Sequence, residues 1–568
     1  MKKNLNFTKA LLLGAAALFI TNIMFAQSLL WEKRYATTGT QDVGIAVHVD
    51  GSGNVYTAGS ARTSSSDDMI LIKYNGSGTQ QWVVNYNGSA NGRDEGYAIA
   101  QDASGYIYVA GTSVQTGQGN DITLIKYNTA GAQQWVQTYS STGYDAAYDI
   151  AINGSNYIYV AGLYNNDAIL LRYNTAGALQ WAYTYNGTAS GLDWFYDIEL
   201  APGSNDPNIY LAGVVTMGNS AHDALTVKVN SAGSVQWSRT FNGAGNAQDE
   251  GYKIKVDRDE YSYVAGFTTG TSSSYQNGLV LKYNTAGTLQ WSATYDGTAY
   301  TASTETDQFF SVDLSSTTAA NPDIYVTGTV TQGSVNNDYV TCKYNSSGGL
   351  VWNITYDGNA SNTVSSDDQA YAVVRSANTG KIFVTGLSEN TNQELNIVTI
   401  RYNPSTGGQE WVGNYNHTVN LTDQPTIYHP LALKYDGCHE TDFIYVTGSS
   451  EAAANDADIV TLKYGNTGPC TAGSEGRFAL AEEYNVPINY GLYPNPFTDF
   501  ATLRINSETE ITNGTLTVYN LFGSVVSAVE NISSNQIIIE RGNMPSGIYI
   551  YRFNSNGNSI VTGKMLIQ

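Results

Sequence analysis

Apolar and polar residues alternate along most of the chain in short runs, which is the pattern of half-buried β-strands. One stretch shows this clearly, with runs at residues 95–101, 106–111, 121–127 and 134–139. Turn-forming sequences separate the runs, for example Asp-Ala-Ser-Gly at residues 102–105. The pattern therefore predicts an all-β protein built from antiparallel strands.

Three motifs recur along the chain with one spacing of 46 to 62 residues. A tryptophan is followed four residues later by an aromatic residue in the pairs Trp31/Tyr35, Trp82/Tyr86, Trp135/Tyr139, Trp181/Tyr185, Trp237/Phe241, Trp291/Tyr295, Trp352/Tyr356 and Trp411/Tyr415. A motif of the form Y-V-A-G ends at Gly59, Gly111, Gly162, Gly213, Gly266, Gly328, Gly386 and Gly448. A motif of the form K-Y-N begins at Lys73, Lys126, Arg172, Lys228, Lys282, Lys343, Arg401 and Lys463. Four strands in each unit of about 50 residues predict a β-propeller, and the motif count predicts eight blades.

The order of the motifs predicts how the ring closes. The chain begins at Trp31 with the motif of a fourth strand, and it leaves the repeats after Lys463, the motif of a third strand. We therefore expect the N-terminal strand to complete the last blade, which would remove the open edges of the ring. We also expect the repeated tryptophans to be buried between blades rather than to bind a ligand.

The repeats resemble those of the secreted bacterial β-propeller family, known as SBBP repeats. The resemblance covers residues 29–464 and rests on the W-x-x-x-Y, Y-V-A-G and K-Y-N motifs, with units six to eight longer than the others. It implies the propeller fold for residues 27–465, and it implies no shared catalytic residues.

The periodicity ends after residue 465, and residues 466–489 have the sequence of a linker. Residues 490–568 contain Pro-Asn-Pro at 494–496, Asn-Leu-Phe-Gly at 520–523 and Met-Pro-Ser-Gly-Ile-Tyr at 544–549. This segment resembles the type A C-terminal sorting domain of type IX (Por) secretion. The resemblance implies a small β-sandwich that the outer-membrane secretion machinery recognises, and that is then removed or exchanged for a surface anchor. The alternative is an ordinary β-sandwich binding module.

The N-terminus predicts export. Residues 1–26 combine Lys2, Lys3 and Lys9 with an apolar run from residue 10 to residue 20, as a secretory signal peptide does. No later segment approaches the length of a membrane span. The predicted location is therefore outside the cell or on the outer surface of a Gram-negative bacterium, reached through the periplasm. In that oxidising environment Cys438 and Cys470 could form a disulfide, whereas Cys342 occupies an apolar repeat position and is expected to be buried.

The charge and the motifs exclude several functions. The 568-residue chain has 49 acidic and 27 basic residues and a formal charge of -22, which gives no electrostatic attraction to nucleic acid. The sequence contains no nucleophile elbow, phosphate loop, zinc-binding spacing or paired histidine motif, so we expect no cofactor, no metal and no catalysis.

One aspartate precedes the first strand of every unit. The set is Asp42, Asp94, Asp145, Asp193, Asp249, Asp307, Asp368 and Asp423. An eightfold repeat favours an architectural role, in which each carboxylate accepts backbone N–H groups between blades. The alternative is a ring of carboxylates at one mouth of the channel that attracts a cation or a basic ligand.

Departures from the repeat point to a candidate binding site beside this ring. Unit four has Trp194 and Phe195 directly after Asp193, and unit six has Phe309 close after Asp307, where most units carry small or polar residues. We predict Asp193, Trp194, Phe195, Asp307 and Phe309 as the ligand-binding set. The alternative is that the aromatic side chains form a hydrophobic plug. Longer connections at residues 297–306, 358–367 and 416–422 are expected on the same face.

These observations favour a non-catalytic secreted propeller that binds a glycan, a peptide or a partner protein. One alternative is a polysaccharide-degrading enzyme that uses carboxylates at the channel mouth, but eight nearly equivalent aspartates lack the asymmetry that an acid and base pair needs. The other alternative is a purely structural surface protein.

Overall fold

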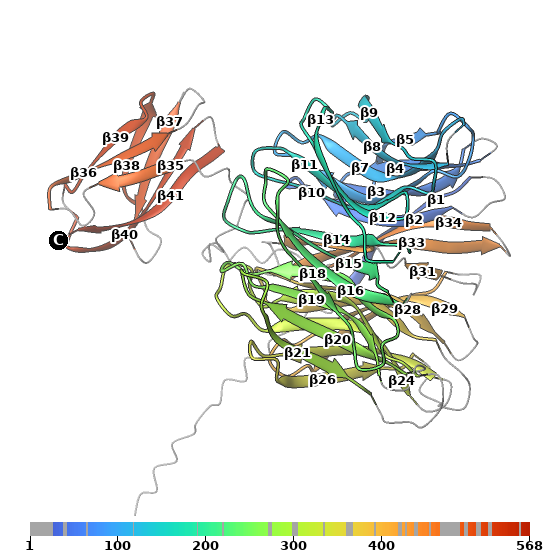
Figure 1. The fold of residues 1–568 in the computed structure, drawn as a ribbon. Helices are drawn as coiled ribbons and strands as arrows, with labels where there is room; N and C mark the ends of the chain where they lie inside the picture. Colours follow the sequence, from blue (N-terminus) through green and yellow to red (C-terminus); the bar gives the residue numbers. More distant parts are fainter. Residues whose placement is uncertain are drawn as a thin grey trace, which may run out of the picture.

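Regular structure in the described residues consists of β-strands alone (Figure 1). The structure is a computed structural model that describes residues 27–567 except residues 38–41, 64–65, 118, 190, 219–220, 271–274, 298–304, 333–335, 359–366, 391–393, 418–422, 426–428, 437–440, 454–455, 466–488, 494–497, 507–512, 521–524, 543 and 556–557. The predicted signal peptide, nearly all of the predicted linker, and Cys438 and Cys470 lie outside the described residues, so those assignments stay predictions.

The described residues before position 466 form one antiparallel sheet for each sequence repeat. Units one to three contain β2 (Val43–Val49), β3 (Val55–Arg62), β4 (Asp67–Tyr74) and β5 (Gln80–Tyr86); β6 (Glu95–Gln101), β7 (Ile107–Val114), β8 (Asn120–Tyr127) and β9 (Gln133–Tyr139); and β10 (Ala146–Ile152), β11 (Ile158–Tyr164), β12 (Asp167–Tyr173) and β13 (Leu179–Tyr185). Units four and five contain β14 (Trp194–Leu200), β15 (Ile209–Thr216), β16 (His222–Val229) and β17 (Val235–Phe241); and β18 (Asp249–Val256), β19 (Ser262–Thr269), β20 (Tyr275–Tyr283) and β21 (Leu289–Tyr295), with β22 (Glu305–Thr306) added beside β20.

The remaining repeats follow the same plan up to the last unit. Units six and seven contain β23 (Gln308–Leu314), β24 (Ile324–Gln332), β25 (Asn336–Tyr344) and β26 (Leu350–Tyr356); and β27 (Gln369–Arg375), β28 (Ile382–Glu389), β29 (Leu395–Tyr402) and β30 (Gln409–Tyr415). The last sheet contains β31 (Asp423–Pro425), β32 (Leu431–Asp436), β33 (Thr441–Ala453), β34 (Asp456–Gly465) and the N-terminal β1 (Ser28–Tyr35). The first strand of each sheet contacts the first strand of the next, so these strands surround the axis and we call them the inner strands. This arrangement confirms the predicted all-β propeller fold.

The N-terminal strand closes the ring, as the order of the motifs predicts. β1 pairs antiparallel with β34 from Ser28 opposite Gly465 to Tyr35 opposite Ile459. The inner strand β2 of the first unit contacts β33 and β34, and the Asp42 N–H donates to the carbonyl oxygen of Ala457 over 2.6 Å. The first and last parts of the repeat region therefore lie side by side, as the blue and orange strands show in Figure 1.

The tryptophan and K-Y-N motifs meet at seven of the interfaces between sheets. The indole Nε1–H of one unit donates to a carbonyl oxygen in the turn between the third and fourth strands of the next unit over 3.0–3.3 Å. The lysine or arginine of the same unit donates to the same carbonyl oxygen, as Trp82 and Lys73 do at Thr129. The pattern ends at Trp411, which packs instead on Tyr464 with ring centroids 5.1 Å apart. The last unit takes its fourth strand from the N-terminus, so it has no turn there to accept the bond.

The turn glycines are required for two reasons. Gly287 has a φ of +76°, which favours glycine, and a Cβ there would lie 2.6 Å from the ring of Trp237. A positive φ and an equally close contact with the equivalent tryptophan of the preceding unit recur at Gly131, Gly177, Gly233, Gly348 and Gly407. These glycines let the turn approach the indole that donates to it.

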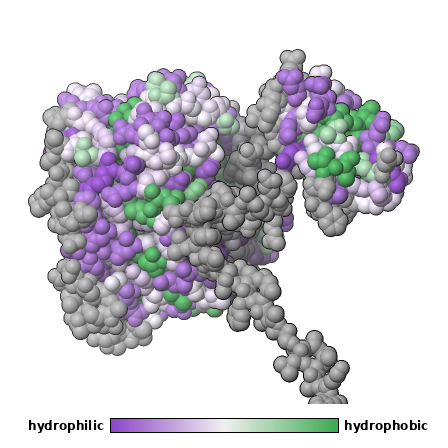
Figure 2. Space-filling view, turned by 180° about the vertical axis from the view of Figure 1, so that it is seen from behind, coloured by the Kyte–Doolittle hydropathy of each residue, from purple (hydrophilic) through white to green (hydrophobic). Residues whose placement is uncertain are grey.

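The C-terminal segment forms its own two sheets. One contains β35 (Asn489–Tyr493), β36 (Phe500–Asn506) and β39 (Gln536–Glu540), and the other contains β38 (Val525–Ile532), β37 (Gly514–Tyr519), β40 (Gly547–Ser555) and β41 (Asn558–Ile567). Both sheets contribute to one buried core that includes Leu503, Leu516 and Phe553. This domain also carries an apolar surface patch, visible in green in Figure 2. Its exposed large apolar residues are Phe500, Val525, Val526, Val529 and Ile538.

Two further features concern export and cysteine chemistry. Within the described part of the chain, no helix has the length and apolar character that a membrane crossing needs. Cys342 is fully buried as a free thiol, which confirms its predicted place in the apolar core.

Candidate functional site

A β-bulge in the inner strand of units one to seven turns one residue toward the propeller axis. The pairing of the inner strand with the second strand shifts register at one equivalent place in units one to seven. A bulge leaves one residue out of the ladder and redirects its side chain. The Y-V-A-G glycine lies opposite the bulge, where a Cβ would overlap a carbonyl oxygen of the inner strand. The motif therefore ends in glycine because the bulge brings two backbones together.

The redirected side chains form an almost continuous belt around the axis, which we call the aromatic belt. Its members are Tyr97, Tyr148, Tyr196, Tyr252, Phe310 and Tyr371. Neighbouring rings in the belt have centroids 5.1–6.2 Å apart. Ile45 of the first unit packs against Tyr97 in the same apolar cluster. These contacts span inner strands β2, β6, β10, β14, β18, β23 and β27, so the belt rigidly joins most of the ring at its centre.

The repeated aspartates fill the architectural role. Each of the eight carboxylates accepts at least one backbone N–H, and seven of them accept two. One N–H comes from the connection that leads into the sheet, and the other comes from a residue at or next to the end of the second strand of the same sheet. Asp193, for example, accepts from the N–H groups of Gly187 and Thr216. All eight are at most 2 % exposed. They therefore hold the connections between sheets and do not form an open ring of carboxylates at the mouth.

The structure places only one of the five predicted ligand-binding residues, Trp194, at the surface. Asp193, Phe195 and Phe309 are fully buried, and Asp307 is 2 % exposed, which leaves these four side chains no surface for a ligand. We therefore remove these four from the candidate set.

Packing between units explains the two buried phenylalanines. Phe195 packs with Ala168 of the preceding unit, and Phe309 lies against Gly278, where a Cβ would come within 2.8 Å of its ring. At the interface of units one and two the large residue comes from the preceding unit instead, where Met69 lies against Gly96 of the next inner strand. The phenylalanines thus supply the volume that the preceding unit lacks, because protein interiors are close-packed.

Trp194 belongs to a compact cluster at the edge of the aromatic belt, which we call the Trp194 cluster. Its ring makes T-shaped contacts with Tyr196 and His222, with centroids 5.5 Å and 5.1 Å away. The Tyr196 hydroxyl donates to Glu250 Oε2 over 3.1 Å, and His222 Nδ1 lies 3.5 Å from Glu250 Oε1. Burial and the Glu250 carboxylate raise the pKa of Tyr252 well above its ordinary value. The cluster therefore combines a fixed aromatic surface with polar atoms that hold one another.

His222 was not in the predicted set, yet a sequence signal exists for it. It lies opposite the position three residues after the Y-V-A-G glycine. At this register the other units have Asp67, Asn120, Asn166, Gln276, Asn337, Leu395 and Ala457. Trp194 and His222 are thus both departures from the repeat in unit four. The sheet brings them together because β15 lies between β14 and β16 and pairs Trp194 with Val214 and His222 with Thr216.

A charged network occupies the inner strands one and three residues beyond the belt positions. Lys253 Nζ lies 2.7 Å from Asp197 Oδ1, and Lys255 Nζ lies 2.8 Å from Glu199 Oε2. Asp149 Oδ1 lies 3.1 Å from Nε2 of His429, which comes from the last unit. Burial opposes the charge on Asp149, but His429 and Lys253 outweigh it and hold the Asp149 pKa well below its ordinary value.

The carboxylates of the network also accept backbone N–H groups from the neighbouring unit. Asp149 accepts the N–H of Ile198, and Asp197 accepts the N–H of Ile254, in each case from the next inner strand. Burial raises the pKa of Asp197, and the neighbouring Asp149 adds to the rise while Lys253 opposes it. These contacts assign the network to holding the inner strands of neighbouring units together.

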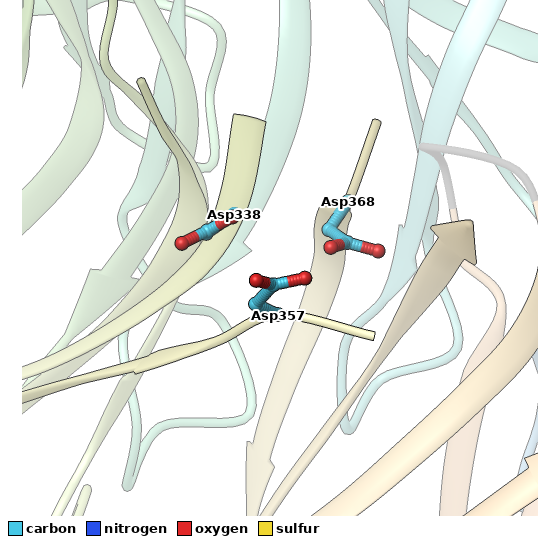
Figure 3. Close-up of side chains that lie close together, drawn as sticks. All are labelled: Asp338, Asp357 and Asp368. Carbon is cyan, nitrogen blue, oxygen red and sulfur yellow. The ribbon is translucent and has the colours of Figure 1, made fainter. Parts of the chain in front are cut away.

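One of the repeated aspartates, Asp368, converges with two other carboxylates between units six and seven (Figure 3). One oxygen each of Asp338, Asp357 and Asp368 lies within 4.8 Å of the others, the one group of three possible metal ligands in the described residues. Burial raises the pKa of Asp338 to about 7, and the charges of Asp357 and Asp368 contribute to the rise. Burial also raises the pKa of Asp368 to about 6, against hydrogen bonds that lower it. At neutral pH these side chains therefore repel one another across the interface.

We expect Asp338→Asn to stabilise the propeller above pH 7. A carboxyl whose native pKa is raised contributes stability below its ordinary pKa of 3.8, and this contribution is lost as the pH rises through about 7. Units five and seven carry Asn277 and Asn396 at this register, so the scaffold accepts asparagine there. The expected gain at pH 8.5 is about 2–4 kcal/mol, with little change at pH 4.5, measured by denaturant unfolding. Equal gains at both pH values, or a loss at pH 8.5, would contradict the repulsion.

Comparison with solved structures and protein families gives the following similarities. Sqt1 from Chaetomium thermophilum is 12 % identical with a TM-score of 0.46, covering 76 % of this chain and 98 % of that one. The Dos1 propeller is 9 % identical with a TM-score of 0.44, covering 77 % and 95 %. Extracellular domains 1–2 of Drosophila Semaphorin 1b are 7 % identical with a TM-score of 0.36, covering 77 % and 87 %. A search of curated proteins gave no match.

The family comparison identifies the C-terminal part. Residues 491–568 match the family described as the secretion system C-terminal sorting domain. This agrees with the resemblance seen in residues 490–568 and with the two-sheet domain found there. The protein therefore carries a sorting domain of type IX secretion, which directs export to the cell surface or the extracellular space.

Proposed function

We propose that this protein is a non-catalytic propeller that binds an extracellular glycan, peptide or protein with the Trp194 cluster, and that its repeats are of the SBBP type. The observation that carries the proposal is that two residues that differ from the repeat pattern, Trp194 and His222, contact each other at the edge of the aromatic belt. Elsewhere the repeated residues serve the scaffold, so a feature that one unit alone carries is where a specific function is expected.

The C-terminal sorting domain supports the proposal that the ligand is extracellular. A sorting domain of type IX secretion is joined to a rigid ring, and such a protein meets its ligands outside the cell. The mature protein is secreted or attached to the outer surface, and the sorting domain engages the secretion machinery before its removal or exchange.

We expect Trp194→Ala to weaken binding at least tenfold without unfolding the protein. Unit three carries Ala146 at the equivalent register, fully buried in a sheet of the same plan, so the scaffold accepts alanine there. The loss follows from removal of the aromatic surface, because buried aromatic contacts contribute strongly to binding. The measurement is binding of the intact secreted protein to glycan, peptide and protein arrays.

The control variant is Gln369→Ala, at the same register in unit seven, which should bind as the wild type does. Failure of the wild-type protein to bind on any array would favour the structural alternative. Turnover of an arrayed glycan would favour the enzyme instead.

A further inference from the structure

We infer that pairs of buried carboxylates at the interfaces between units share protons, so that the ring is more stable in mildly acidic than in alkaline surroundings. This inference does not depend on what the Trp194 cluster binds. It follows from a second repeated acidic position, from its place beside the repeated aspartates, and from the one interface that supplies a basic partner.

A second acidic position recurs in the third strand of the units, and we call it the third-strand position. It lies opposite the residue two positions after the Y-V-A-G glycine. Six units carry aspartate there and two carry asparagine, in the order Asp68, Asp121, Asp167, Asp223, Asn277, Asp338, Asn396 and Asp458. Five of the six aspartates are at most 6 % exposed.

Backbone hydrogen bonds place this position beside the repeated aspartate of the following unit. At six interfaces the repeated aspartate donates its N–H, over 2.6–2.9 Å, to the carbonyl oxygen of the residue just before the third-strand position. Figure 3 shows the outcome for Asp338 and Asp368, which have carboxylate oxygens within 4.8 Å of each other. Where both positions carry aspartate, two carboxylates are therefore neighbours across the interface.

One of these pairs has a basic partner. Asp458 of the last unit lies 2.9 Å from Arg34 on the N-terminal strand β1. Among the described residues, no lysine or arginine forms an ion pair with either member of the other five pairs. These five are Asp68/Asp94, Asp121/Asp145, Asp167/Asp193, Asp223/Asp249 and Asp338/Asp368.

Two of the third-strand carboxylates also have an oxygen without a partner. Oδ1 of Asp121 and Oδ1 of Asp223 accept no hydrogen bond within the described part of the chain, although both side chains are at most 3 % exposed. Burial raises the pKa of each to about 6, and the carboxylate of Asp145 or Asp249 adds to the rise. A proton on such an oxygen removes the cost of burying a charge and gives the pair a donor.

The same causes act in the other pairs. Burial raises the pKa of Asp94 to about 6, with a contribution from Asp68, against backbone N–H groups that lower it. Burial and then Asp193 raise the pKa of Asp167. Burial also raises the pKa of Asp193, while hydrogen bonds and the nearby His222 oppose the rise. Neighbouring carboxylates that cannot both ionise near neutral pH keep one proton between them.

The sign of the pH dependence follows from the direction of these shifts. A carboxyl whose native pKa is raised contributes stability below its ordinary value of 3.8, and this contribution is lost as the pH rises through about 6 to 7. The folded ring holds more protons than the unfolded chain in this range. Its stability should therefore fall as the pH rises.

The test is thermal unfolding of the intact protein followed by tryptophan fluorescence, because all nine tryptophans lie before residue 466. The melting temperature should fall by roughly 3–6 °C between pH 5.5 and pH 8.5. The triple variant Asp121→Asn/Asp223→Asn/Asp338→Asn should melt roughly 3–6 °C above the wild type at pH 8.5, and this gain should be at least halved at pH 4.5. Units five and seven already carry asparagine at this position.

Asp458→Asn is the matched control, because it changes the same position where Arg34 supplies a basic partner. It should lower the melting temperature at both pH values, since the guanidinium group then lacks its carboxylate. A gain from Asp458→Asn at pH 8.5 as large as that of the triple variant would show that asparagine stabilises this position for a reason other than shared protons, and would overturn the inference.

Two further outcomes would also overturn it. One is a gain of the triple variant that is the same at both pH values, or a loss at pH 8.5. The other is stabilisation of the wild type but not of the triple variant by 5 mM calcium chloride at pH 8.5, beyond that of sodium chloride at equal ionic strength, because the pairs would then hold a cation in place of a proton. If the triple variant does not fold, the three single variants apply the same criteria to one interface each.

Discussion

Replacing Lys253 by methionine should lower the free energy of unfolding by about 3 kcal/mol. The Lys253 side chain is 18 % exposed and its ammonium group lies 2.7 Å from Asp197, whose side chain is 7 % exposed. Removing Lys253 leaves the buried Asp197 carboxylate beside a second one, Asp149, whose pKa His429 also lowers against the effect of burial. Denaturant unfolding followed by fluorescence measures the loss.

The double variant Lys253→Met/Asp197→Asn separates the charge effect from packing. Asparagine keeps an oxygen that accepts the Ile254 N–H, which Asp197 accepts over 2.7 Å, but it needs no cation. We expect the double variant to recover most of the stability that the single variant loses, because replacing a buried ion pair as a whole costs far less than breaking it. A single variant as stable as the wild type would show that the ion pair contributes nothing.

Removing the N-terminal strand should open the ring. A mature chain that starts at residue 37 lacks β1 and leaves the edge of β34 unpaired from Ile459 to Gly465. It also loses the Trp31 donation to the Gly76 carbonyl oxygen. Loss of the ladder hydrogen bonds alone should cost on the order of 5 kcal/mol, and the exposed edge should promote association between chains.

Thermal unfolding and light scattering of the truncated chain measure both effects. A synthetic peptide covering residues 27–37 should restore the melting temperature when added to the truncated chain, whereas a peptide of the same composition in reversed order should not. Unchanged stability and a monomeric state after truncation would refute closure by β1. A destabilised chain that the native peptide does not rescue would mean that the strand acts only when covalently attached.

Much of the propeller could be predicted from local sequence. Alternation and turn residues predicted the strands, and the motif order predicted that β1 completes the last sheet, because an unpaired fourth strand at one end and a missing one at the other must meet. The repeated aspartates were also interpreted correctly as architectural, since a feature present in every unit serves what the units share.

The candidate site was predicted less well for a physical reason. Sequence alternation shows neither which residue a bulge redirects nor how much volume a neighbouring unit leaves open. Phe195 and Phe309 were therefore included in the candidate set, whereas they fill the volume left by Ala168 and Gly278, and the bulges redirect Tyr196 and Phe310 next to them.

The chain by itself thus determined the strands, the repeat and the closure of the ring, because each depends on neighbouring residues or on the order of units. Only the tertiary structure decided which side chains meet. Trp194 and His222 are 28 positions apart and become neighbours through the intervening strand β15. Lys253 and Asp197 meet because consecutive inner strands converge on the axis. Contacts between units depend on register and packing volume at two distant positions at once, which no single segment of sequence contains.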